Sequence, residues 1–452
     1  MLKFKKSLSL MLVAVLTLVS VLGGVKLSVK AKASEPVVIT YANWNIGSDI
    51  EKKIIKAFEA THPNIKIQIA NNVDYGNYEK SLTAAAAAGK LPDVIMIPNI
   101  PMALTNNWAL NIKSYVQNDK EWNHIPAPIR NATYYGNGVY AVPAGIYFMG
   151  YFVNDDLFKK YNQKTLPFAP KMQDFLASIK KLNKPQDLVI GLAEEVQIPE
   201  WYPAAVNKKL GWYTWDGSKY NLNDPAFIQG VRIAKDLYTN KYVFDSLSAE
   251  QKKKLNAGWY GDAWNAGKIA VRWSGTWDIK GFKSLKFNSR FIGVPGGRTP
   301  VVGDFMIISK TTKHPKEAYE FARYITFAHS GILKRIELDT KGEWTSLPLT
   351  TEQSILNKFF MGKLRYPGLK EAYQSMTNGI IEGVKIVPGY IPSRWTAPTG
   401  IKVGDKANAS IGDVIWNSMR GNVNISDYAA QLNKLANQEY QKASEIIKKL
   451  TK

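Results

Sequence analysis

The chain has 452 residues, of which 45% are hydrophobic and 21% are charged. This length and composition are typical of a globular protein of about two domains and exclude a disordered chain. The formal net charge is +22 and comes mainly from dispersed lysines. Such a balance suits an anionic surface or an acidic ligand, and no nucleic-acid-binding motif accompanies it. With no cysteine in the sequence, disulfides, thiol nucleophiles and cysteine metal sites are excluded.

Residues 1–33 are predicted to be an export signal. Three early lysines precede an uncharged apolar run at 8–25, and "AKAS" at 31–34 offers small residues for cleavage near Ala33. The run is short for a membrane span of about 20 residues, although retention as an N-terminal anchor is the alternative. Val25 occupies the lipidated-cysteine position of a lipobox-like "VLGGV", so a lipid anchor is not expected. Removing the six lysines of 1–33 leaves a net charge of +16, on a secreted, cell-surface or periplasmic protein.

The first exported segment alternates between strand and helix patterns. Ser48 is a suitable N-cap for the first helix, His62-Pro63 ends it, and Gly89 closes the second helix. This order predicts a parallel sheet with helices on both faces and therefore the α/β class. The predicted strands are 37–44, 64–70 and 92–99, and the predicted helices are 47–63 and 78–89.

The rest of the chain continues the α/β pattern. Two separate strands are predicted at 139–143 and 148–154, with Asp155 or Asp156 capping the next helix. A strand, a loop and a helix are predicted within 304–327, with Pro315 in the first helical turn. A long amphipathic helix is predicted at 426–450.

Open parallel sheets bind ligands beyond the carboxyl ends of their strands. Polar and aromatic side chains follow each of the first three predicted strands. They are Trp44, Asn45 and Ser48 after the first strand, Asp74 and Tyr75 after the second, and Asn99 after the third.

Enzymatic motifs are not evident. The four histidines are dispersed, and the chain has no HExxH, GxSxG, Walker loop or GxGxxG after its first strand. Paired carboxylates such as Glu194 and Glu195 could serve a glycosidase, but such pairs are common at helix starts. We therefore expect no catalytic residues, no cofactor and no metal, with a secreted glycan-active enzyme as the remaining alternative.

The stretch "WNAGKIAVRWSGTWDI" at 264–279 resembles the extracellular solute-binding proteins of bacterial ABC importers. Within them it resembles the sugar-binding family that includes maltose-binding protein. "YAVPAGIYFMGYFVNDDLF" and "VVGDFMIISKTTKHPKEAYEFARYI" resemble it as well. The resemblance implies the class II periplasmic-binding-protein fold, in which two α/β lobes close on a ligand cleft. It places lobe I at 34–145 plus 304–358 and lobe II at 146–303 plus 359–452.

The resemblance also implies a function and a set of site residues. The chain would deliver an oligosaccharide to the permease subunits of an ABC importer, as a monomer, without nucleic acid and without chemistry on the ligand. A non-sugar solute such as a peptide is the alternative. Trp277 would stack on a sugar ring, whereas Trp264 and Trp273 are predicted to be core residues. The other implied contacts are Tyr147, Trp201, Tyr202, Asp304 and Trp395.

Arg272 lies in a predicted strand that leads to the cleft. A partly buried arginine needs an acidic partner, and two partners are open. It either pairs with a protein carboxylate or, like Arg298, receives the carboxylate of an acidic sugar. An acidic or substituted oligosaccharide is therefore one candidate ligand.

Overall fold

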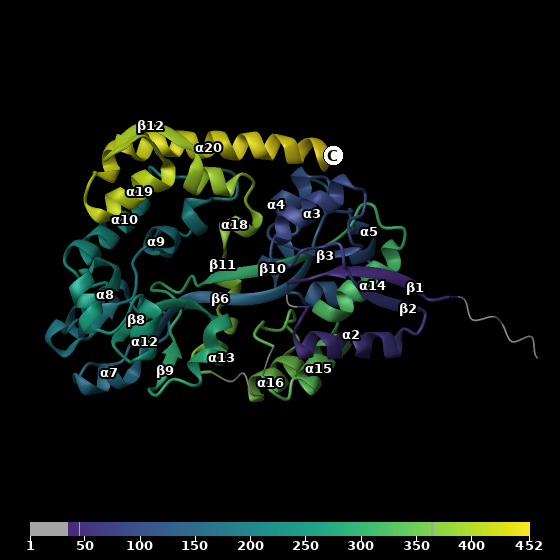
Figure 1. The fold of residues 1–452 in the computed structure, drawn as a ribbon, viewed down its shortest axis with the longest axis horizontal. Helices are drawn as coiled ribbons and strands as arrows, with labels where there is room; N and C mark the ends of the chain where they lie inside the picture. The colour runs from purple at the N-terminus through teal and green to yellow at the C-terminus, as the bar shows by residue number, and fades with distance from the viewer. Residues whose placement is uncertain (1–34, 45, 343, 363–365) are drawn as a thin grey trace, which may run out of the picture. The chain divides into compact units, whose positions relative to one another are not determined.

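The fold is described from a computed structural model (Figure 1), which describes residues 35–44, 46–342, 344–362 and 366–452. The described helices and strands lie in one compact unit, Val37–Lys452. The predicted export signal lies outside the described residues. Within the described ranges, no helix combines the length and apolarity that crossing a membrane would require.

The central element is a nine-stranded mixed sheet with the main order β2-β1-β3-β10-β6-β8-β7, in which β11 pairs with β10 and β9 pairs with β6. Its strands are β1 Val37–Ala42, β2 Ile65–Ile69, β3 Val94–Ile97, β6 Val142–Asn154, β7 Ile190–Leu192, β8 Ile269–Gly275, β9 Ser289–Phe291, β10 Pro300–Ile308 and β11 Ile380–Ile381. Two small hairpins, β4 Tyr134–Tyr135 with β5 Gly138–Val139 and β12 Pro398–Val403 with β13 Lys406–Ser410, lie outside it.

The N-terminal strand–helix alternation is confirmed. β1 pairs in parallel with both β2 and β3, as the βαβ order requires. The helix between β1 and β2 is α2 Asp49–Thr61, and the Oγ of Ser48 accepts a hydrogen bond from the Glu51 amide at 3.3 Å. The predicted cap at Asp155 or Asp156 is wrong, because Asn154 Oδ1 accepts the Leu157 amide instead. Both aspartates lie in the first helical turn, where their charge suits the helix dipole.

Two long strands, β6 and β10, run antiparallel through the middle of the sheet (Figure 1). The prediction of two strands at 139–143 and 148–154 is wrong, because β6 is continuous over 13 residues. Its middle stays extended because β10 provides partners there, with Gly145 opposite Asp304 and Tyr147 opposite Val302. The two strands thus join the β1–β3 half of the sheet to the β7–β8 half.

Helices cover both halves of the sheet, and two apolar clusters form the core. One cluster is built mainly around β1, β3 and α14, and the other around β8, α9, α10 and α19. The helices besides α2 are α3 Tyr78–Ala87, α4 Ile100–Thr105, α5 Lys113–Val116, α6 Ala127–Asn131, α7 Asp155–Lys160, α8 Met172–Leu182, α9 Ile198–Val206, α10 Pro225–Thr239, α11 Ala249–Lys254, α12 Tyr260–Asn265, α13 Ile279–Phe282, α14 Pro315–Thr326, α15 His329–Leu338, α16 Gln353–Met361, α17 Leu369–Gln374, α18 Gly383–Ile386, α19 Ile411–Arg420 and α20 Ile425–Leu450.

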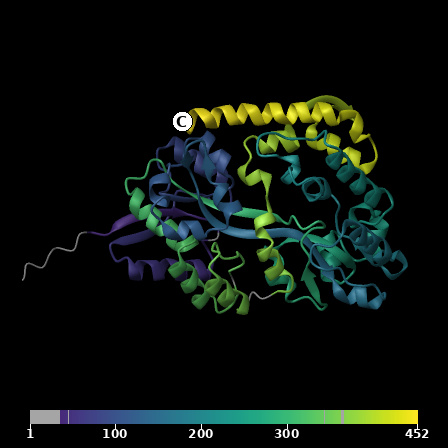
Figure 2. The ribbon, with the colours of Figure 1, turned by 180° about the vertical axis from the view of Figure 1, so that it is seen from behind.

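The predicted C-terminal helix is confirmed as α20. It starts beside α10 and α19, and its far end lies over α4, on the other half of the sheet (Figures 1 and 2). Two of its asparagines accept hydrogen bonds from the loop that precedes α10. Asn433 accepts from the Leu222 amide, and Asn437 accepts from the Tyr220 amide. The helix therefore bridges the same two halves that β6 and β10 join.

Candidate ligand-binding site

A pocket of about 550 Å³ lies between the loop after β1 and the two long strands β6 and β10. We call it the central pocket. Its lining is Trp44, Ser48, Ile50, Glu51, Tyr147, Trp277, Val302, Asp304, Arg335, Trp344, Thr345, Glu382 and Lys385. Residues from the loop after β1 and from α2, β6, β10, α15 and α18 thus converge on one place, although these segments are far apart in the sequence.

Most charges in the central pocket are paired. The buried carboxylate of Glu51 accepts from Arg335 Nη1 at 3.1 Å and from the Tyr41 hydroxyl at 2.8 Å. The Nζ of Lys385 lies 3.0 Å from Asp304 Oδ1. Because these charged side chains are already held in place by their partners, they can offer hydrogen-bond donors and acceptors to a ligand with little loss of conformational entropy. The pocket is therefore polar but nearly balanced in charge.

Glu382 is the exception in the central pocket. Burial raises the pKa of its carboxyl to about 7, and the positive charge of Lys385 only partly opposes this. A carboxyl group with such a pKa is present as both acid and carboxylate near neutrality, so it can donate or accept a hydrogen bond.

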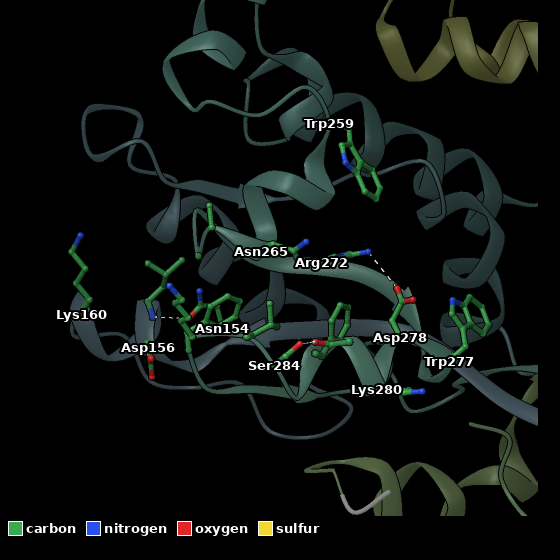
Figure 3. A pocket seen from close by; sticks show the side chains of 18 residues that line it. Asn154, Asp156, Lys160, Trp259, Asn265, Arg272, Trp277, Asp278, Lys280 and Ser284 are labelled. Carbon is green, nitrogen blue, oxygen red and sulfur yellow. Dashed lines mark hydrogen bonds and ion pairs between the residues drawn. The ribbon is translucent and has the colours of Figure 1, made fainter. Parts of the chain in front are cut away.

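Figure 3 shows a second and larger pocket, of about 1260 Å³. We call it the lateral pocket. It is lined by Asn154, Asp156, Leu157, Lys160, Trp259, Asn265, Ala266, Gly267, Arg272, Trp277, Asp278, Lys280, Gly281, Phe282, Ser284, Leu285, Lys286 and Phe287. Trp277 lines both pockets, so the two adjoin at this indole, and we refer to them together as the groove.

Trp277 stands on the 3₁₀ turn Thr276–Asp278 that directly follows β8. Its side chain is 41% exposed, and Tyr147 meets it edge to face at 5.9 Å between ring centroids. Gly275 lies against the indole, and a Cβ at that position would overlap the ring. By contrast Trp264 and Trp273 are buried, which confirms that these two rings are core residues.

Trp259 was missed by the sequence reasoning. It is 51% exposed in the lateral pocket, and its Nε1 donates to Asp262 Oδ1 at 2.9 Å. Its ring lies against Gly261, where a Cβ would overlap it. The two exposed tryptophans of this pocket thus share one local pattern, a glycine two residues away, in "WYG" at 259–261 and "GTW" at 275–277. That shared spacing was the available signal.

Four predicted residues besides Trp277 also line the central pocket: Trp44, Ser48, Tyr147 and Asp304. Trp44 is 37% exposed and packs edge to face on Tyr78. Burial raises the pKa of the Tyr147 hydroxyl, which keeps it a neutral hydrogen-bonding group. The structure therefore gathers these five predicted residues around one space, from the loop after β1, from β6 and β10, and from the turn after β8.

The polar residues predicted after β2 and β3 have local roles. Asp74 is exposed and accepts from the Gly76 amide and from Asn77 Nδ2. Asn99 caps α4 by accepting from the Met102 amide at 2.8 Å. Tyr75 donates to the Ala70 carbonyl. None of these three is among the lining of the two pockets, and Asn45 lies outside the described residues.

Three other predicted aromatic residues, Trp201, Tyr202 and Trp395, line neither pocket. Trp201 is fully buried and its Nε1 donates to the Tyr151 hydroxyl at 3.2 Å, so its ring belongs to the core and offers no stacking face. Tyr202 is half-buried at a separate hollow of about 480 Å³. Trp395 is 46% exposed but packs on the Arg394 guanidinium, away from the lining of both pockets.

The two candidate arginines differ. Arg298 donates to the backbone carbonyls of Ala204, in the last turn of α9, and of Lys208 and Leu210 beyond it, so it is a structural residue and is not in either pocket. Arg272 lines the lateral pocket and has an ion pair with Asp278, Nη2 to Oδ2 at 3.3 Å. Arg272 therefore forms an ion pair with a protein carboxylate, which was one of its two predicted partners.

Comparison with known proteins assigns the chain to a family. Residues 41–329, more than half of the chain, match the model of the bacterial extracellular solute-binding proteins. The chain belongs to this family, whose members bind solutes and are not known as enzymes.

Individual relatives are more distant. The multiple sugar-binding protein of Streptococcus mutans is 26% identical over 337 residues, which is 67% of this chain and 74% of that protein. An ABC substrate-binding protein from Listeria monocytogenes, solved with cycloalternan, has a TM-score of 0.68 at 18% identity and covers 89% of this chain and 99% of its own. A cyclic α-maltosyl-1,6-maltose-binding protein from Arthrobacter globiformis has a TM-score of 0.65 at 14% identity, with 90% and 100% covered. These likenesses show the two-lobe solute-binding fold.

Proposed function

We propose that this chain binds an oligosaccharide outside the cytoplasm and delivers it intact to the membrane permease of an ABC importer. The single observation that carries the proposal is the groove, in which an exposed indole, Trp277, stands where the two pockets meet. A pyranose ring has an apolar C–H face that packs on an indole, and its hydroxyls need oriented polar groups at the ring edge. The groove offers both.

The ligand contacts proposed for the central pocket follow from this arrangement. Trp277 and Trp44 supply stacking faces, and Tyr147 and Asp304 supply hydrogen bonds, with Trp344 as a further aromatic wall. The combined size of the two pockets suits more than one sugar residue. The sugar-binding names of the relatives support the same ligand class.

The proposed lobes are those expected from the sequence, 34–145 plus 304–358 and 146–303 plus 359–452. The two strands that join the halves of the sheet, β6 and β10, would form the hinge. Closure about them would bury the sugar and complete a surface that the permease recognises. Export by a signal at 1–33 would place the protein where its ligand is found.

Calorimetric titration with oligosaccharide pools tests the proposal. The wild type is expected to bind at least one pool saturably, and the sugar is expected to be recovered with unchanged chain length. Trp277→Ala should weaken that binding about tenfold or more, as truncation of a central aromatic contact commonly does.

Trp416→Ala is the matched control. Trp416 is an equally exposed tryptophan on α19 that packs on Arg420 outside both pockets, and its loss should leave the affinity unchanged. Release of shortened products would indicate an enzyme, and equal affinities of wild type and Trp277→Ala would place the ligand elsewhere.

A further inference from the structure

The lateral pocket carries an excess of positive charge. Its lining includes four cations, Lys160, Arg272, Lys280 and Lys286, and two carboxylates, Asp156 and Asp278. The three lysines form no ion pair with a carboxylate in the described ranges. The central pocket differs, because its arginine and its lysine are both paired with carboxylates.

The two carboxylates of the lateral pocket are already engaged by neighbours. Asp156 accepts from the side-chain amide of Asn288 at 2.9 Å. Asp278 accepts from the Ser274 hydroxyl at 2.5 Å and from Arg272. Neither carboxylate forms an ion pair with one of the three lysines, so the positive charges of these lysines are not neutralised within the pocket.

Arg272 is the buried centre of this charge. Its side chain is 9% exposed, and it lies beside the rings of Phe282 and Tyr260, 4.9 and 5.7 Å from its guanidinium carbon. A guanidinium has five N–H donors, but Arg272 has one carboxylate contact, at 3.3 Å. Its Nε is buried without a hydrogen-bond partner among the described residues. A buried charge paired this sparsely is costly unless a further anion completes its coordination.

The position of Arg272 relates it to the stacking residues. In Figure 3 the Arg272–Asp278 pair lies between the indoles of Trp259 and Trp277. A sugar ring that stacks on Trp277 and extends into the lateral pocket would therefore bring its substituents toward the guanidinium. Lys280, exposed on α13, is the nearest free cation in sequence to that pair.

From this juxtaposition we infer that the lateral pocket selects oligosaccharides that carry an anionic substituent, a carboxylate or a sulfate, which Arg272 and Lys280 receive. Guanidinium groups bind both anions through paired N–H donors. This inference rests on the proposed function, since it assigns the substrate class of the same groove. The neutral sugar faces would still stack on the indoles.

The test compares matched pools. Oligosaccharides from uronic-acid polysaccharides are titrated beside the same pools after carboxyl reduction, and oligosaccharides from sulfated galactans beside the same pools after desulfation. The wild type is expected to bind an acidic pool about tenfold or more tightly than its neutralised counterpart. The arm that binds distinguishes the carboxylate from the sulfate.

Variants assign the preference to the pocket. Arg272→Met and Lys280→Met should each weaken binding of the acidic pool, by about tenfold for the arginine, and leave the neutral pool unaffected. Lys280 is exposed, so its variant remains informative if Arg272→Met fails to fold. Lys448→Met, which removes one charge from the exposed end of α20, is the control and should change neither affinity.

The outcomes separate the two proposals. Equal or tighter binding of the neutralised pools, or an acidic preference unchanged in both pocket variants, would overturn the anionic inference and leave sugar binding intact. Binding of no pool, acidic or neutral, would contradict the proposed function itself.

Discussion

Glu382 gives the central pocket a titration near neutrality. Burial raises the pKa of its carboxyl from 4.5 to about 7 in the folded protein, so folding favours the protonated form. Its contribution to the free energy of unfolding is full below about pH 4 and is lost as the pH rises through 7. At pH 8 the folded protein holds a carboxylate that burial disfavours.

Glu382→Gln should therefore raise the free energy of unfolding at pH 8, by on the order of 2 kcal/mol, and change it little at pH 4. Urea denaturation at the two pH values measures this. Glu445→Gln, at an exposed position of α20, should have no effect at either. A Glu382→Gln variant less stable than wild type at pH 8 would contradict the assigned titration.

Single residues also show where sequence reasoning reached the site. Trp277, which the family resemblance singled out, is exposed and lines both pockets, and Trp264 and Trp273, which were predicted to be core residues, are buried. The burial of Trp201 could not be predicted in this way, because an aromatic segment has the same local sequence whether its ring faces a cleft or the interior. Arg335, Glu382 and Trp344 reach the pocket from segments without a local pattern.

At the scale of elements, local patterns predicted the first three strands and two helices well, because their apolar spacing and caps are complete within the segments themselves. β6 was predicted as two pieces, since its continuity depends on β10, a strand about 150 residues away. Pairing partners at such a distance leave little trace in the local sequence.

The bridging helix α20 makes a prediction at this scale. Leu432 is completely buried on its inner face. Leu432→Ala should lower the free energy of unfolding by about 2–4 kcal/mol, because the deletion leaves a cavity in the core. Leu450→Ala removes the same atoms where the side chain is 38% exposed and should cost well under half as much. Chemical denaturation of the two variants compares them, and equal losses would mean that the helix contributes little through Leu432.

At the scale of the whole molecule, two features meet only in the folded chain. His124 and His329, which look dispersed in the sequence, lie together with Nδ1 and Nε2 3.1 Å apart. The two pockets likewise combine residues from Trp44 to Lys385. Composition and charge could indicate an anionic environment, but they could not show that unpaired cations gather in one of the two pockets.

The net charge of +16 after residue 33 predicts weak retention on anionic wall polymers. The chain without its N-terminal 33 residues should adsorb to an anionic resin at about 0.1 M salt. It should elute as the salt concentration is raised toward about 1 M, because the screening length becomes shorter. Arg272→Met should elute at nearly the same salt, since one pocket charge is a small part of the total. Retention on the resin that high salt does not reduce would contradict this electrostatic account.

The most direct test of the central claim is a crystal structure of the protein with the oligosaccharide that it retains from the pools. The account predicts a sugar ring stacked on Trp277, with the bound chain entering both the central and the lateral pocket. A ligand seated away from Trp277, for example beside Tyr202 or Trp395, would contradict it.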